Sequence, residues 1–168
     1  MYKSIIIAGF IFVAALIASA HDGRDDPFEK GSLRASVVFG SGEAFENEYT
    51  IMGLGAGYYL KDRVELGLDG EAWLGGDPDI YKLSPQAKYV LSTQSRFRPY
   101  VGAFYTHAFV HNEDDLDSVG CRGGVYVVQD DRWFVGVGAV YETVLECNEK
   151  VHDSCEDIYS EISISFTF

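Results

Sequence analysis

The chain has 168 residues, a formal net charge of −13 and 47% apolar residues, with 18 glycines, 11 tyrosines and 11 phenylalanines but only two methionines and four prolines. This composition is unusual for a soluble domain, and its length fits a single domain behind an export signal. The sequence has no basic patch for nucleic acid, no zinc-ligand spacing and no glycine-rich phosphate loop, so we expect neither a nucleic-acid partner nor a cofactor.

The first twenty residues have the pattern of a secretory signal peptide. Lys3 precedes an apolar run from Ile5 to Ile17, and Ala18-Ser19-Ala20 has the small-x-small form of a cleavage site. The run is too short for a comfortable transmembrane helix. We predict cleavage after Ala20 and a mature domain of residues 21–168, with an uncleaved anchor as the alternative.

Beyond this segment, apolar residues alternate with polar ones or glycine in eight stretches, which predicts eight β-strands. Pro85 lies inside the fourth stretch and lacks a backbone donor, so we expect a bulge or an irregularity there. In the first four stretches the apolar face consists of Leu33, Ala35, Val37 and Phe39, then Met52, Leu54, Ala56, Tyr58 and Leu60, then Val64, Leu66, Leu68, Ala72 and Leu74, then Tyr81, Leu83, Ala87, Tyr89 and Leu91.

The second half continues the alternation. The stretch 99–110, PYVGAFYTHAFV, is ambiguous because both of its faces are largely apolar. We favour an apolar outer face formed there by Val101, Ala103, Tyr105 and Phe109. The last three stretches place Val119, Cys121, Val125 and Val127, then Trp133, Val135, Val137, Ala139 and Tyr141, then Ile162, Ile164, Phe166 and Phe168 on the apolar face.

The charged residues within these stretches all fall on the opposite face, and this is most informative for 64–74 and 81–91, which carry several charges of one parity. In a membrane barrel the apolar face contacts lipid and the charged face lines the enclosed interior. Closing the sheet into a barrel also removes strand edges whose unpaired backbone groups would be costly in a membrane. We therefore predict an all-β fold, an eight-stranded antiparallel up-and-down transmembrane β-barrel. Its interior charges are predicted to be Arg34, Glu65, Asp69, Glu71, Lys82, Lys88, Arg122, Glu142 and Glu161.

Short and long connections alternate along the chain, as they do in outer-membrane barrels. The longer ones, which we assign to the extracellular side, are strongly acidic, and Lys150 is their only lysine or arginine. These four predicted loops are Ser41–Glu48, Gly75–Asp79, His111–Ser118 and Glu146–Asp157.

With its signal segment, eight alternating stretches and a final stretch ending in Phe168, the chain resembles the small OmpA/OmpX-like outer-membrane barrels. The phrases RPYVGAFY and WFVGVGAVYE are similar to strand sequences of that superfamily. The resemblance implies a Gram-negative-type outer membrane, with lipopolysaccharide and the barrel-assembly machinery as partners. It also implies that Ile164, Phe166 and Phe168 form an assembly signal.

An eight-stranded barrel is narrow enough for side chains to fill. We therefore predict a plugged lumen in which buried acids and bases are paired, because unpaired buried charges are costly. A gated pore lined by the interior charges is the alternative. The inward glycines, Gly53, Gly55, Gly57, Gly136 and Gly138, are expected to leave room for Arg34, Arg122 or water.

Cys147 and Cys155 bracket the last long loop. Because exported cysteines are usually oxidised, we predict that these two form a disulfide. Pairing of Cys121 with either of them is the competing possibility.

The segment His152-Asp153-Ser154 is the only sequence here that suggests catalysis, since outer-membrane lipid A deacylases use a His-x-Ser pair with a carboxylate. Those groups lie on strands, whereas this segment lies in a polar loop, and His107 is followed two residues later by Phe109 instead of serine. We therefore predict a non-enzymatic surface protein, structural or adhesive. A narrow pore is the second hypothesis and a lipid A-modifying enzyme the third.

The acidic loops are the feature most suited to a function. Their carboxylates could bind divalent cations that bridge to lipopolysaccharide, or a cationic surface partner, although no stretch has the spacing of an EF-hand.

Overall fold

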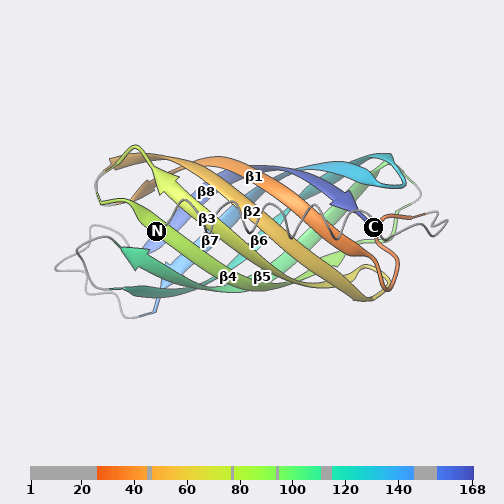
Figure 1. Ribbon diagram of the computed structural model, residues 1–168, viewed down its shortest axis with the longest axis horizontal. Coiled ribbons are helices and arrows are strands. Elements are labelled where there is room, and N and C mark those ends of the chain that lie inside the picture. The colour runs from red at the N-terminus through yellow and green to blue at the C-terminus, as the bar shows by residue number, and fades with distance from the viewer. Residues whose placement is uncertain (1–25, 45–46, 77, 94, 111–114, 146–154) are drawn as a thin grey trace, which may run out of the picture.

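The computed structural model describes residues 26–44, 47–76, 78–93, 95–110, 115–145 and 155–168. They form a closed barrel in which each strand pairs antiparallel with its neighbours in sequence and β1 pairs with β8, as predicted (Figure 1). Among these residues, no helix is long and apolar enough to cross a membrane. The strands are β1 Leu33–Ala44, β2 Asn47–Lys61, β3 Val64–Leu74, β4 Ile80–Val90, β5 Phe97–Val110, β6 Leu116–Asp130, β7 Trp133–Val144 and β8 Glu156–Thr167.

The two ends of the barrel differ in their connections. We call the end that carries the β2–β3, β4–β5 and β6–β7 turns, together with residues 26–32 and Phe168, the leader end, and the opposite end the loop end (Figure 1). The β2–β3 turn is only two residues long, and Arg63 adopts a left-handed φ of 66° in it. The register shifts beside this turn, between Tyr59 and Lys61, and beside the β6–β7 turn, between Val128 and Asp130.

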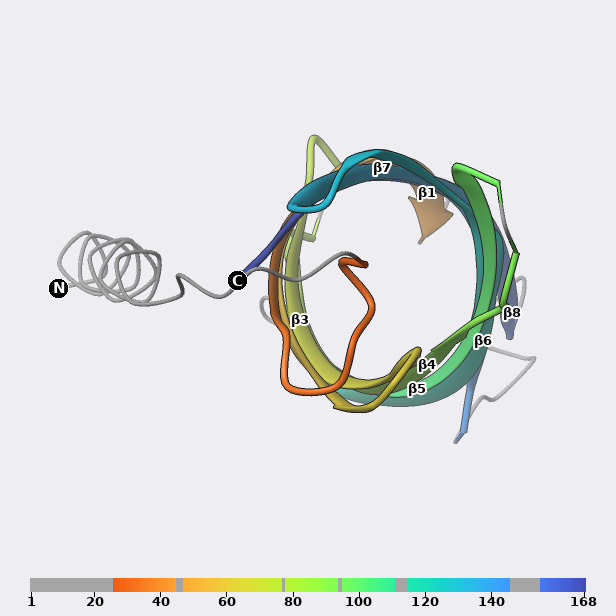
Figure 2. The ribbon, with the colours of Figure 1, turned by 90° about the vertical axis from the view of Figure 1, so that its right-hand side faces the viewer.

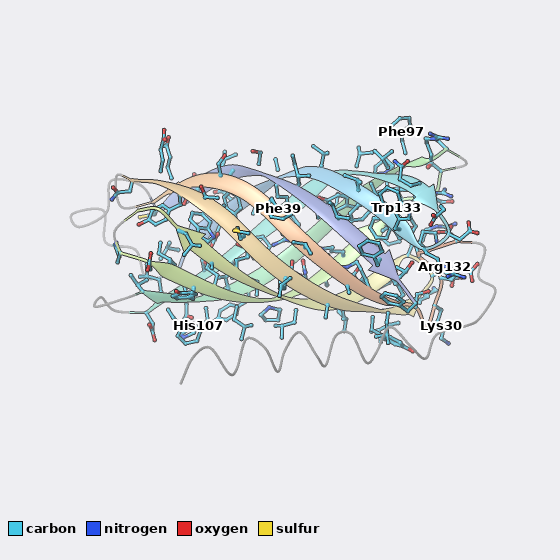
Figure 3. All side chains as sticks on the ribbon, turned by 45° about the horizontal axis from the view of Figure 1, so that its top comes forward. Lys30, Phe39, Phe97, His107, Arg132 and Trp133 are labelled. Atoms are coloured by element: carbon cyan, nitrogen blue, oxygen red, sulfur yellow. The ribbon has the colours of Figure 1, made fainter. Side chains whose placement is uncertain are left out.

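The outer surface of the barrel is apolar over its whole middle. The side chains of Leu54, Leu68, Val101 and Val137 are each about half exposed in the isolated chain. Exposing so much apolar surface is unfavourable in water and favourable in the hydrocarbon core of a membrane. Aromatic side chains flank this band, among them the outward-facing Phe97 and Trp133 at the leader end (Figure 3). Tyr58, Tyr89 and Phe166 lie near the same end, and Tyr81, Phe109 and Tyr141 lie near the loop end.

The predicted facing of residues 99–110 is confirmed, because Val101, Tyr105 and Phe109 point outward whereas Phe104 is buried in the lumen. At Pro85 the register does not shift, so there is no bulge, but the β4–β5 ladder is interrupted at Ser84 and Pro85, which is the predicted irregularity. The side-chain oxygens of Ser84 and Thr106 lie 2.6 Å apart across this gap. A side-chain contact thus replaces part of the ladder that proline cannot complete.

Three of the four predicted loops are shorter in the structure than predicted. Strand pairing continues through Ser41–Ala44 and Asn47–Glu48 in the first connection, β6 already begins at Leu116, and β8 begins at Glu156. These pairs lie beyond the apolar band, where both faces of a strand meet polar surroundings. Alternation therefore stops marking a strand there, although backbone pairing persists. The loop Gly75–Asp79 agrees with the structure.

Residues 26–32 fold back across the leader end of the barrel instead of extending away from it (Figure 2). The backbone N–H of Gly31 donates to the carbonyl of Tyr59 at 2.8 Å, and the N–H of Tyr59 donates to the carbonyl of Ser32 at 3.0 Å. No pattern in residues 26–32 predicts this contact. Residues 1–25 lie outside the described residues, so the signal peptide and its cleavage after Ala20 remain predictions.

Candidate functional site

The lumen is filled by three layers of side chains. An aromatic layer lies at the leader end, an ionic layer lies in the middle, and a mixed apolar and charged layer lies at the loop end. The leader-end layer consists of Phe28, Tyr59, Val90, Tyr100, Tyr126 and Phe134. The apolar part of the loop-end layer includes Tyr49, Ile51, Trp73, Ile80, Phe104, Val110, Val140 and Tyr159.

The ionic layer is centred on two arginines. Arg34 Nε donates to the Glu65 carboxylate at 2.9 and 3.0 Å, and its Nη2 lies 3.6 Å from Asp69. Arg122 Nη1 lies 3.0 Å from Asp69 and 3.3 Å from Glu161. Asp69 is therefore shared by both arginines, and none of these pairs joins neighbouring strands. The ion pairs cross the lumen and tie together β1, β3, β6 and β8.

The other interior charges lie on either side of this centre. Lys88 is buried and interacts electrostatically with Glu65 and Asp69. Glu71, also buried, accepts a hydrogen bond from the Trp73 indole at 3.1 Å. Together with Arg34, Arg122 and Glu161, every one of these groups has an oppositely charged or hydrogen-bonding neighbour, which is what burial of charge requires.

A second ion pair lies in the loop-end layer. Lys82 Nζ is 2.8 Å from Glu142 and sits 3.9 Å above the centre of the Trp73 ring. Glu142 also accepts hydrogen bonds from Ser118 and, at 3.3 Å, from the Tyr159 hydroxyl. Lys82 is directly opposite Glu71 on the neighbouring strand, yet its ammonium reaches across the lumen to β7. This pair therefore braces the barrel near the loop rim, as the arginines do in the middle.

The glycines of β2 have a different purpose from the one predicted. Gly53 and Gly55 lie opposite Glu71 and Asp69 in the β2–β3 register, whereas Gly57 lies opposite Gly67, two residues along β3 from Glu65. A Cβ at Gly55 would collide with the Asp69 carboxylate, and one at Gly57 would collide with Glu65. These glycines make room for the carboxylates of β3, not for the arginines.

The glycines of β7 make room for lumen side chains other than the arginines. A Cβ at Gly138 would collide with the Tyr100 hydroxyl, and one at Gly136 would collide with Ser163 and press on Tyr126. Tyr100 and Tyr126 stack with ring centroids 4.1 Å apart, and the Tyr100 hydroxyl donates to Glu161 at 3.1 Å. The stacked rings thus connect the aromatic layer to the ionic layer. Sequence reasoning missed this stack, although the small residues facing it were visible.

The rim of the loop end is acidic. Its described acids are Glu43, Glu48, Asp79, Asp115, Asp117, Glu156 and Asp157, and the described parts of 41–50, 74–80, 107–119, 142–145 and 155–158 contain no lysine or arginine. At the leader end both signs occur, with Lys30, Lys61, Arg63, Arg96, Arg98 and Arg132 beside Asp26, Glu29, Asp62, Asp130 and Asp131. The described residues include no group of three or more histidine, cysteine or acidic side chains placed to hold a metal ion.

His107 lies on the outside of the barrel near the loop rim (Figure 3). Its Nδ1 is 2.7 Å from Asp117, which also accepts a 2.6 Å hydrogen bond from the Tyr105 hydroxyl, and its Nε2 is 3.7 Å from Asp115. Within the described part of the chain, no serine or threonine hydroxyl is hydrogen-bonded to this ring. The segment His152-Asp153-Ser154 lies outside the described residues.

The cysteine prediction is resolved in part. Cys121 is a free thiol on the outer face of β6, so the competing pairing through Cys121 is not formed. Cys147 lies outside the described residues, and its disulfide with Cys155 remains a prediction.

The predicted assembly residues lie at the leader end of β8. Ile164 and Phe166 point outward, and Phe168 exchanges two backbone hydrogen bonds of 2.9 and 3.0 Å with Leu33. Their reading by the barrel-assembly machinery remains a prediction from the resemblance.

No protein-family model and no curated protein matches the sequence. Solved structures do match. The N-terminal β-barrel domain of Pseudomonas aeruginosa OprF is similar with a TM-score of 0.66 and 19% identity, over 83% of this chain and 98% of that one. Neisserial surface protein A (NspA) is similar with a TM-score of 0.62 and 16% identity, over 82% of this chain and 96% of that one. The outer membrane protein OprG from Pseudomonas aeruginosa is similar with a TM-score of 0.56 and 13% identity, over 86% of this chain and 99% of that one.

The chain has the fold of the small eight-stranded outer-membrane barrels. A de novo designed transmembrane β-barrel matches it as well, with a TM-score of 0.56. Since a designed transmembrane barrel is also similar, the likeness shows the architecture of this chain, and any activity has to be argued from its own side chains.

Proposed function

We propose that this protein is a non-conducting, non-enzymatic barrel of a Gram-negative-type outer membrane, acting at the surface through its acidic loop rim. The observation that carries the proposal is the filled lumen. Arg34, Glu65, Asp69, Arg122 and Glu161 form ion pairs across its middle, and packed aromatic rings lie on both sides of them. Outer-membrane neighbours in fold support the location.

Conductance of the refolded protein in a planar lipid bilayer tests whether the barrel is non-conducting. We expect no discrete conductance steps above those of the lipid alone, because buried aromatic rings and paired charges occupy the interior of this narrow barrel. A large porin refolded in the same way serves as the positive control. Reproducible single-channel steps from the wild-type protein would favour the narrow-pore alternative and overturn the proposal of a non-conducting barrel.

The proposed action through the loop rim is supported by the uneven distribution of charge between the two ends of the barrel. The described loop rim carries acids without lysine or arginine, whereas the leader rim carries both signs. Such a field attracts cationic surfaces and raises their rate of encounter, and the attraction weakens with salt. A cationic surface partner is therefore the ligand class that this rim suits, with lipopolysaccharide bridged to the carboxylates by divalent cations as the alternative.

Binding of polylysine to the barrel in nanodiscs, measured at low and at high salt, tests this. The loop-rim variant combines Glu43→Gln, Glu48→Gln, Asp115→Asn and Glu156→Gln, and the matched leader-rim control combines Glu29→Gln, Asp62→Asn, Asp130→Asn and Asp131→Asn. We expect the loop-rim variant to lose most of the salt-sensitive binding and the control to keep most of it. Equal loss in both would show that net charge alone, and not the loop rim, attracts the polycation.

The non-enzymatic part of the proposal is supported by His107, the histidine that the structure describes on the outer face. Both of its ring nitrogens face carboxylates, and its ring packs edge-on against Phe109 with centroids 4.5 Å apart. Nucleophilic catalysis by a histidine base needs a hydroxyl or thiol within hydrogen-bond reach of the ring. Mass spectrometry of lipid A from cells with and without the protein tests the enzymatic alternative, and we expect identical lipid A species.

A further inference from the structure

We propose that residues 26–32 form a plug that seals the leader-end mouth of the lumen against water, with Phe28 as its anchor. This inference deepens the proposed non-conducting function and rests on it, because it names the segment that closes one end of the barrel. We call residues 26–32 the leader.

The anchor is a single aromatic side chain inserted among the lumen rings. Phe28 is 1% exposed, although it precedes the first strand. Its ring centroid lies 4.9 Å from that of Phe134, 5.8 Å from that of Tyr126 and 6.0 Å from that of Tyr59. These three residues belong to β7, β6 and β2, so the ring contacts widely separated parts of the wall and fills the space between them.

The backbone of the leader is fixed to the wall around this ring. The Phe28 carbonyl accepts a 2.8 Å hydrogen bond from the N–H of Arg63, and the N–H of Lys30 donates to Asp62 at 3.0 Å. On the far side, Asp26 lies 3.7 Å from Arg98 at the start of β5. These contacts connect the leader to the β2–β3 turn and to β5. Its trace lies within the ring of strands in the view into this end (Figure 2).

Behind the anchor, the contacts continue into the ionic layer. Phe28 lies against Tyr126, Tyr126 stacks on Tyr100, and Tyr100 donates to Glu161, which pairs with Arg122. Water that passed the leader would meet buried charges within a few side chains. The ring of Phe28 thus separates the aqueous leader side from groups whose mutual attraction depends on a dry interior.

The attachment of the leader is weaker than that of a strand. It is held by one buried ring, a few backbone hydrogen bonds and a partly exposed ion pair, whereas each strand is paired along its length on both sides. Segments with few buried contacts open at lower free energy than the body of a domain. Release of the leader would expose the aromatic layer while the barrel wall stays folded.

Thiol accessibility measures this opening directly. Ser165 lies in the lumen on β8, 1% exposed, opposite Phe134 and Ser36 in the two neighbouring strands. In a background with all three native cysteines changed to serine, Ser165→Cys places a reporter thiol behind the leader. A water-soluble cationic methanethiosulfonate is added to the refolded barrel in nanodiscs, and the labelling rate is followed by mass spectrometry.

We expect Phe28→Ala to raise the labelling rate at least about tenfold, because losing the ring favours the open leader. Asp26→Ala should raise it by a smaller factor, since it removes only the ion pair to Arg98. The matched control is Phe104→Ala, which deletes a buried ring from the loop-end layer and should leave the rate near that of the parent.

Two results would overturn the plug. One is an unchanged labelling rate in a Phe28→Ala barrel whose circular dichroism shows intact strands. The other is an equal increase from Phe104→Ala, which would indicate general loosening. If Phe28→Ala does not refold, Phe28→Leu replaces it with the same expected direction. Conductance of the wild-type protein is measured separately, so a failure of the proposed function and a failure of the plug give different results.

Discussion

At the scale of single residues, Arg122 is the side chain on which the interior charges depend most. It is 3% exposed and contacts Asp69 and Glu161, which are themselves buried. Its guanidinium also lies 4.8 Å from the Phe104 ring, so it joins the ionic layer to the loop-end layer. Removing it would leave two carboxylates in the lumen with less compensation than burial requires.

We predict that Arg122→Leu lowers the free energy of unfolding by about 3–5 kcal/mol, the cost of breaking a buried pair from one side. Urea unfolding of the refolded barrel, followed by tryptophan fluorescence, measures it. Arg96→Leu is the control, because Arg96 is exposed at the β4–β5 turn and should change the free energy by no more than about 0.5 kcal/mol. Similar losses in the two variants would contradict the role given to the ion pairs.

The glycines of the β2–β3 pair permit an equally sharp comparison. Gly55 faces the lumen where a Cβ would collide with Asp69 and Ser36, whereas a Cβ on Gly70 would meet nothing within 4 Å. We predict that Gly55→Ala destabilises the barrel by about 1–3 kcal/mol, as overpacking does. Gly70→Ala should be neutral or should stabilise by up to about 1 kcal/mol, because it restricts the unfolded chain. The same urea assay compares them, and the reverse order would show that the lumen adjusts freely around β2.

At the scale of strands, the cost of an outward-facing charge depends on its depth in the membrane, and β3 offers two positions for comparison. We predict that Leu68→Arg, in the middle of the outer apolar band, costs about 2–4 kcal/mol in a lipid bilayer, whereas Leu74→Arg, at the loop-end terminus of the same strand, costs about 0–1 kcal/mol. Unfolding from vesicles gives both values. Equal costs would mean that the apolar band does not mark the hydrocarbon region.

The strands and their facing could be predicted because alternation is a local signal. Even in the ambiguous stretch 99–110, the predicted outward residues Val101, Ala103, Tyr105 and Phe109 lie on the outer face. The ends of the strands could not be predicted. Gly42, Glu43 and Glu48 remain paired in the β1–β2 hairpin, but outside the apolar band nothing distinguishes a paired polar residue from a loop residue.

At the scale of the whole molecule, the sequence indicated which charges face the lumen but not which of them meet. Cross-strand neighbours would suggest Lys82 with Glu71, yet Lys82 contacts Glu142 on the far wall. Such pairs depend on the tilt and stagger of a closed barrel, which no single stretch encodes. The leader was missed for a related reason, because Phe28 has no periodicity around it and its partners come from three distant strands.

The three lumen layers lie in series, and this arrangement distinguishes a plugged barrel from a gated one. In a gated pore one group controls passage, so its loss opens the path. In a plugged barrel the loss of one layer leaves two others closed. We therefore predict that Phe28→Ala, Asp69→Asn and Trp73→Ala, each of which weakens one layer, show no more conductance than the wild-type protein in a planar bilayer.

The three variants also report where any error in this prediction lies. Opening by Asp69→Asn alone would identify the carboxylate shared by Arg34 and Arg122 as a gate, and would replace the plugged lumen with the narrow pore. Opening by Phe28→Ala alone would make the leader the sole barrier. We expect no conductance from any of the three variants when their strand content is retained. The reason is that water must pass an aromatic layer, a set of crossed ion pairs and the Lys82–Glu142 brace in succession.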